Sequence, residues 1–269
     1  MNKNEIIKFN LEKRLTQTLD SFNALSNKEP IFQKLLAELN SFDFEIYKKI
    51  IEEEIKINLI EWWTNTKRGI IPSEELYAIL FEYDYFLQKG VEATSYGIGE
   101  WKDYKVHTDE FDKGFDYDFT TEFYASPGMS VNFFDPLQIL DHNEIEDKYK
   151  DVDIEEFSGY EEIIQLFKVK GMIAIHEVIV KLDKEGVFEK LNFKDNFMFI
   201  IDEHDSGEVY PLLIKSKKEE SFSKNEILNQ HQYLEENKNI VYQIKKWWQI
   251  WKNTTSNNGY DDHISLRTL

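Results

Sequence analysis

The amino-acid sequence predicts an α+β fold: an antiparallel sheet of two hairpins, covered by helices, with helical extensions at the N- and C-terminal ends. Two observations indicate this architecture. Apolar residues recur at helical spacing through 43–66 and through 159–182. The segments 76–96 and 197–214 instead have the composition of two short strands separated by a turn. We expect the two hairpins to pair into one sheet beneath the two helices.

The first sixty-six residues are predicted to be helical. A stripe that includes Leu11, Leu15 and Phe22 marks a first helix, and Glu29-Pro30 separates it from a second helix over 31–39. Asp43 is the predicted N-cap of the third and strongest helix, which we expect to end near Thr66. Its core-facing residues are spaced by three or four positions: Phe44, Tyr47, Ile51, Ile55, Leu59 and Trp62.

The strands are predicted from composition and turn residues. In the first hairpin, 76–85 alternates and is rich in aromatic and β-favouring residues, 88–90 forms the turn and 91–96 is the second strand. In the second hairpin, strands at 197–201 and 209–214 flank a turn at 205–207. Pro211 lacks the N–H group that a ladder requires, so it predicts a sheet edge or a bulge.

The remaining segments define the domain organisation. Residues 97–153 are predicted to form long loops with short strands or one short helix. The helix over 159–182 contains Gly171, which predicts a kink or a split, and it is predicted to end at 184–186. Beyond a charged linker, apolar residues recur every seven positions in 227–251 and predict a further helix. We therefore expect one domain over 1–214 and an appended segment over 215–269.

Composition excludes several classes of protein. The chain of 269 residues has a net charge of −19 and no cysteine. It therefore has no disulfide, no thiol chemistry and no cysteine-ligated metal. Its negative field repels nucleic acid and anionic membrane surfaces. No apolar run reaches the length of a membrane span or a signal peptide, so a cytoplasmic protein is expected.

Negative charge is concentrated in one segment. Residues 100–162 hold 19 Asp and Glu against 5 Lys and Arg, a net of −14, and they are interleaved with aromatic residues. This pattern predicts a surface that binds a basic partner, with the carboxylates speeding encounter and the rings providing contact area. The candidate partner-binding residues are Glu82, Asp84, Glu100, Trp101, Asp109, Glu110, Asp112, Asp116, Tyr117 and Asp118.

The sequence also contains candidates for other chemistry. Glu82 and Asp84 alternate onto one strand face, and with carboxylates around 100–118 they could form a metal-assisted hydrolase site. His107 lies in the acidic segment and is a candidate base or ligand. The segment 109–118 lacks the spacing of a calcium loop, and no zinc helix, nucleophile elbow or phosphate loop is present. No cofactor and no catalytic residue are predicted.

Four motifs resemble a group of uncharacterised bacterial immunity-type domains found near polymorphic-toxin genes. These are LYAILFEYD at 76–84, GIGEW at 97–101, LDKEGVF at 182–188 and FMFIIDEHDSGE at 197–208, within a match over about 43–214. The resemblance implies a non-enzymatic inhibitor of a basic partner such as a toxin. An assembly protein that binds or forms homo-oligomers through its C-terminal helix is a further alternative.

Overall fold

The computed structural model describes residues 1–60, 75–112, 114, 116–120, 125–141, 145–146, 149 and 152–217, with the side chains of 59 and 60 excepted. Four α-helices are described: α1 (Lys3–Ala24), α2 (Pro30–Ser41), α3 (Phe44–Glu54) and α5 (Tyr160–Lys184). A π-helical turn, η1 (Ile55–Ile60), continues α3. Shorter 3₁₀ segments are η3 (Asn132–Leu140), η5 (Ile154–Glu156) and η6 (Val187–Lys190).

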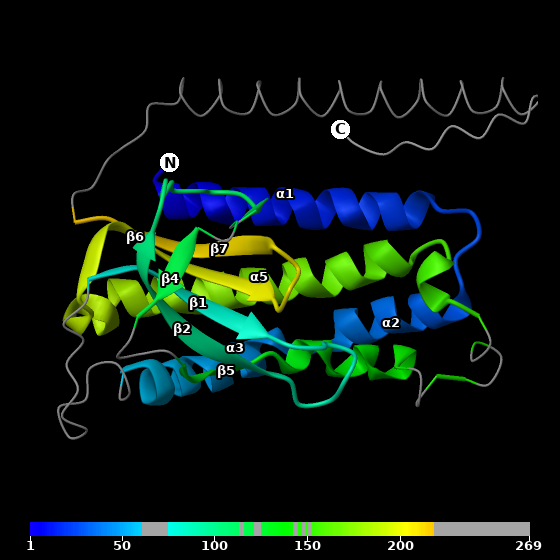
Figure 1. Cartoon of the computed structure of the whole chain (residues 1–269). Helices are drawn as coiled ribbons and strands as arrows, with labels where there is room; N and C mark the ends of the chain where they lie inside the picture. Colours follow the sequence, from blue (N-terminus) through cyan, green and yellow to red (C-terminus); the bar gives the residue numbers. More distant parts are fainter. Residues whose placement is uncertain are drawn as a thin grey trace, which may run out of the picture. The chain divides into compact units, whose positions relative to one another are not determined.

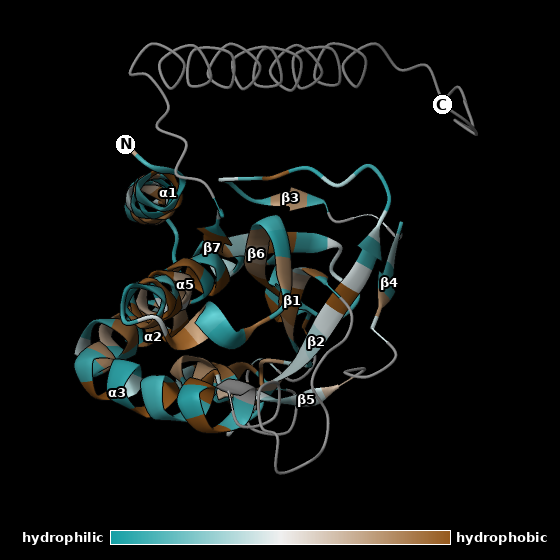
Figure 2. Ribbon diagram, turned by 90° about the vertical axis from the view of Figure 1, so that its left-hand side faces the viewer, coloured by the Kyte–Doolittle hydropathy of each residue, from teal (hydrophilic) through white to brown (hydrophobic). Residues whose placement is uncertain are grey.

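The strands form one seven-stranded sheet. They are β1 (Leu76–Tyr83), β2 (Glu92–Trp101), β3 (Phe111–Asp112), β4 (Tyr117–Phe119), β5 (Ser126–Ser130), β6 (Phe193–Glu203) and β7 (Glu208–Lys215). Their order is β3-β7-β6-β1-β2-β4, and β5 pairs with β2 beside β4. The helices lie on one face of this sheet (Figure 1; Figure 2). The predicted combination of helices and sheet in an α+β fold is therefore confirmed.

The prediction of an antiparallel sheet is wrong. Both predicted hairpins are present as antiparallel pairs, β1 with β2 and β6 with β7, but β1 and β6 join them in parallel, with Ile79 opposite Phe199. Parallel strands require a crossover connection, and α5 lies in the connection between β1 and β6. The sheet is consequently mixed. The second strand of the first hairpin also runs beyond its predicted end at 96 to Trp101.

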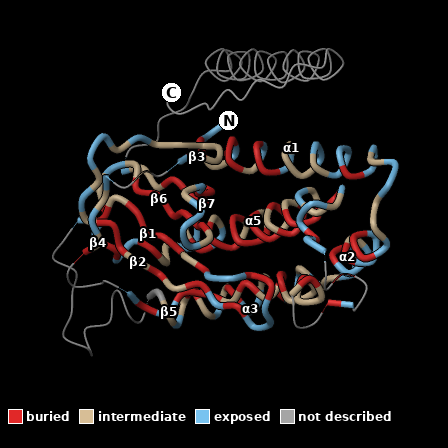
Figure 3. The backbone as a smooth tube through the Cα atoms, turned by 45° about the vertical axis from the view of Figure 1, so that its right-hand side comes forward, coloured by how far each residue is buried: buried red, intermediate tan, exposed pale blue. Residues whose placement is uncertain are grey.

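Helix α5 is the centre of the helical layer. It packs against α1, α2, α3 and β7, and most of its length is buried (Figure 3). Gly171 does not split it, since α5 is continuous from Tyr160 to Lys184, and the glycine instead admits the ring of Phe133. A Cβ atom at this position would lie 2.3 Å from that ring. The helix ends at the predicted position, where Gly186 has a φ of 74°.

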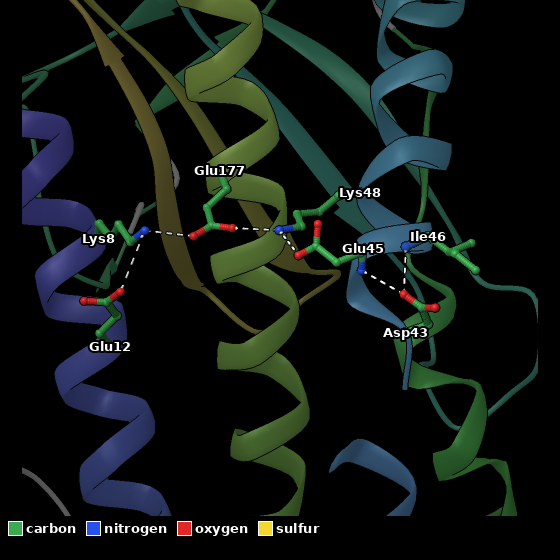
Figure 4. A network of polar contacts seen from close by, with 7 residues as sticks. All are labelled: Lys8, Glu12, Asp43, Glu45, Ile46, Lys48 and Glu177. Atoms are coloured by element: carbon green, nitrogen blue, oxygen red, sulfur yellow. Dashed lines mark hydrogen bonds and ion pairs between the residues drawn. The ribbon is translucent and has the colours of Figure 1, made fainter. Parts of the chain in front are cut away.

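One carboxylate ties three helices together (Figure 4). Glu177 of α5 accepts hydrogen bonds from Lys8 of α1 at 2.8 Å and from Lys48 of α3 at 3.1 Å. Burial favours the protonated form of Glu177, but the two lysines outweigh it and lower its pKa. Asp43 caps α3 as predicted and accepts from the backbone N–H groups of the first turn.

Further predictions concern β7 and segments beyond the described residues. Pro211 lies at a β-bulge, as predicted, because the register of β7 against β6 shifts between Leu213 and Pro211. The predicted linker begins too early, since Lys215 belongs to β7 and binds Asp183 and Glu189. Two predictions lie outside the described residues. They are the helix over 227–251, with the homo-oligomer assigned to it, and the end of the third helix near Thr66. None of the described helices has the length and hydropathy needed to cross a membrane.

Candidate functional site

The acidic segment connects the two edges of the sheet. Strand β3 pairs with β7 at one end of the strand order and β4 pairs with β2 at the other, yet only residues 113–116 separate β3 from β4. Five interstrand spacings in a flat sheet would measure about 24 Å. The chain from Asp112 to Tyr117 spans at most about 18 Å. The sheet must therefore curl so that its edges approach each other (Figure 2).

Aromatic rings join these edges. Trp101, at the end of β2, lies 5.7 Å from Tyr117 of β4 and 6.4 Å from Phe111 of β3, measured between ring centroids. Tyr104 lies 5.3 Å from Trp101, and its hydroxyl donates to the carbonyl of Asn196 at 2.5 Å. The predicted contact rings Trp101 and Tyr117 are half-buried and take part in the protein's own packing. The carboxylates beside them are thus the more accessible groups.

Four of these carboxylates form two like-charge pairs across strands. The register places Glu100 opposite Asp118 on β2 and β4, and Asp112 opposite Glu208 on β3 and β7. All four are exposed, and within the described part of the chain no ion pair reaches any of them. Like charges directly opposite each other destabilise a sheet. We call these four residues the acidic edge; Glu208, at the start of β7, was missed in the sequence because it lies outside the acidic segment.

Two predicted carboxylates share one arginine of the chain. Arg14 of α1 forms ion pairs with both Asp109 and Glu110, at 3.5 Å to Asp109. The same guanidinium lies over the ring of Tyr210. Asp109 and Glu110 therefore anchor the acidic segment to α1. Asp116 is exposed, and its backbone carbonyl accepts from Lys102.

Glu82 and Asp84 lie away from the Glu100–Asp118 pair of the acidic edge. Glu82 is opposite Thr94 on β2, and Glu100 lies six residues further along that strand, roughly 20 Å away at the rise of a β-strand. Glu82 contacts His204 at 3.2 Å and raises its pKa by accepting a hydrogen bond, while Asp84 is exposed. The hydrolase hypothesis requires Glu82 and Asp84 to converge with the carboxylates of 100–118. Among the described residues the structure shows no such cluster.

His107 is engaged in packing. Its ring stacks on Phe111 at 4.1 Å, and burial lowers its pKa. Among the described residues, no group of three or more His, Asp or Glu side chains is arranged to hold a metal ion.

The comparisons with known proteins add no relative. No protein-family model, no curated protein and no solved structure matches this chain. The geometry described above is therefore the basis for assigning a function.

Proposed function

We propose that this chain is a non-enzymatic binding protein that occludes a basic protein partner, in the manner of an immunity-type inhibitor of a toxin. The observation that carries the proposal is the acidic edge, with Glu100 opposite Asp118 and Asp112 opposite Glu208. Each pair places two exposed negative charges face to face, which costs stability in the free protein. A cationic partner surface removes that repulsion on binding.

The overall charge supports the same interpretation. A net charge of −19, with −14 of it in 100–162, attracts a basic protein over distances limited by ionic screening, about 8 Å at physiological salt. Such attraction accelerates association and suppresses partners of the wrong sign. The resemblance of 43–214 to immunity-type domains favours a toxin as the partner.

A charge-matched pair of variants tests whether the acidic edge is the binding surface. The first variant carries Glu100→Gln, Asp112→Asn, Asp118→Asn and Glu208→Gln. The control neutralises four exposed carboxylates elsewhere: Asp20→Asn, Glu38→Gln, Glu156→Gln and Glu161→Gln. Both variants have the same net charge, so any difference between them reports position rather than total charge.

Cytochrome c, a small basic protein, serves as a probe in calorimetric titrations at low salt. We expect the acidic-edge variant to bind at least tenfold more weakly than the control variant. Equal weakening in both variants would show that only net charge matters and would overturn the assignment of this surface. The immunity role is tested by expressing each variant in cells that also produce a toxin-like product of a neighbouring gene, where only the acidic-edge variant should fail to protect.

A further inference from the structure

A pocket separate from the acidic edge lies between the start of α1 and the end of α5. Its volume is about 710 Å³, within the range of roughly 300–1,000 Å³ that is usual for small-molecule sites. Its lining combines apolar surface with polar side chains, which include Asn2, Glu5, Lys8, His176, Glu177 and Lys184. The two helices are held together here by the ion pair of Lys8 and Glu177 (Figure 4).

The position of α1 at this pocket is fixed by its first turn. The side-chain amide of Asn4 donates to the carbonyl of Ile214 at 3.0 Å and accepts from its N–H group at 2.8 Å. Asn4 therefore pairs with β7 as a neighbouring strand would. Asn2 caps the same helix by accepting from the N–H group of Glu5.

His176 provides a hydrogen-bond acceptor in the pocket wall. The residue is 2 % exposed, and its Nδ1 lies 2.7 Å from the carbonyl oxygen of Leu212. Because a carbonyl can only accept, Nδ1 carries the hydrogen, and the neutral ring has a lone pair on Nε2. Burial lowers the pKa of His176 and favours this neutral form. Within the described part of the chain, no donor reaches Nε2.

The carboxylates around the pocket already have partners. Glu177 binds Lys8 and Lys48, and Asp183 binds Lys215 at 2.7 Å. Glu185 lies 3.8 Å from Lys181.

Lys184 has no ion pair with any described residue. Lys184 lines the same pocket as His176 and follows it on α5. Its positive charge acts on the His176 ring and opposes ring protonation. Both residues belong to α5, so this helix provides the pocket with a cation and a lone-pair acceptor.

We propose that this pocket binds a small carboxylic acid that also carries a hydroxyl or amino group. The carboxylate pairs with the ammonium group of Lys184, and the hydroxyl or amino hydrogen is donated to Nε2 of His176. A ligand with a hydroxyl or amino group but no carboxylate leaves Lys184 unpaired. A simple carboxylate leaves Nε2 of His176 without a donor. Both features of the ligand are therefore required.

Isothermal titration of the full chain with L-lactate, L-serine and propionate tests the proposal. Propionate is the matched control, because it is lactate without the hydroxyl group. We expect saturable binding of lactate or serine, and at least tenfold weaker binding of propionate. Absence of saturable binding by both lactate and serine would overturn the proposal, as would equal affinity for lactate and propionate.

Three variants assign the contacts. His176→Asn retains a donor at the Nδ1 position and removes the acceptor at Nε2, while Lys184→Gln removes the cation. Lys190→Gln, on η6 and outside the pocket lining, is the control. We expect the first two changes to weaken lactate or serine binding at least tenfold and Lys190→Gln to leave it unchanged. Binding that survives both pocket changes would place the ligand elsewhere and overturn the assignment. The cytochrome c titration tests the acidic edge and does not depend on whether the pocket binds a ligand.

Discussion

His176 Nδ1 lies 2.7 Å from the carbonyl oxygen of Leu212, and this contact joins the central helix to the bulge in β7. Leu212 is the extra residue of the bulge, since Leu213 pairs with Phe199 and Pro211 with Ile200. Its carbonyl is thereby released from the regular ladder while the residue is fully buried. The histidine supplies the hydrogen bond that the carbonyl would otherwise lack.

Replacing this histidine separates packing from hydrogen bonding. We expect His176→Leu to lower the free energy of unfolding by about 1–3 kcal/mol, because it leaves the buried carbonyl of Leu212 without a donor. His176→Asn retains a donor at the same position and should cost less. Urea denaturation of both variants measures the difference, and equal losses would show that the hydrogen bond contributes nothing beyond side-chain volume.

The pH dependence of stability follows from the same residue. Burial lowers the pKa of His176, and the charge of Lys8 acts in the same direction, while Glu177 and the bond to Leu212 act against it. The unfolded chain therefore binds the proton more readily than the folded chain. Stability should fall as pH decreases below the ordinary histidine value of about 6.5.

His176→Asn removes this titration, so its unfolding free energy should change less than that of the wild type between pH 7.5 and pH 5.5. His204 acts with the opposite sign, because the hydrogen bond to Glu82 raises its pKa. Its contribution is present below about 6.5 and is lost as pH rises through the raised folded value. His204→Gln is therefore the control. This variant should lose more unfolding free energy than the wild type between pH 7.5 and pH 5.5. A His176→Asn profile parallel to that of the wild type would contradict the assignment.

Gly171→Ala tests the close approach of α5 to η3. Alanine favours a helix over glycine by about 1 kcal/mol, but the added Cβ would lie 2.3 Å from the fully buried ring of Phe133. Overpacking of this kind costs about 1–3 kcal/mol, so we expect net destabilisation despite the better helix former. Denaturant titration of Gly171→Ala with and without Phe133→Leu should show partial rescue in the double variant. A stabilised single variant would mean that the ring moves aside without cost.

The parts of the fold that depend on local patterns were predictable from the sequence. Helix α3 follows from the Asp43 cap and its apolar spacing, and the bulge follows from the missing N–H group of Pro211. The parallel join of β1 to β6 was not predicted, because strand direction depends on the crossover rather than on the residues of either strand. The role of Gly171 was also not predicted, because the ring that packs against it belongs to Phe133, which is distant in sequence.

The candidate site was likewise predictable only where it depends on local sequence. Charge and alternation were sufficient to select Glu100, Asp112 and Asp118 as exposed carboxylates. They could not show that Arg14, almost one hundred positions earlier in the chain, binds Asp109 and Glu110. Glu208 was not predicted, because its relation to Asp112 exists only through the pairing of β3 with β7.

Asp118→Asn should stabilise the free protein. Asp118 is opposite Glu100 on adjacent strands, and removing one of two facing like charges is expected to raise the unfolding free energy by about 0.2–1 kcal/mol. The gain should shrink at high salt, because screening already reduces the repulsion between exposed charges. Glu156→Gln, which neutralises an exposed carboxylate in η5, is the matched control and should change stability little. Thermal unfolding at low and high salt measures both effects. If Asp118→Asn is neutral or destabilising at low salt, the two carboxylates do not repel each other in the free protein, and the physical basis for the acidic edge as a binding surface is lost.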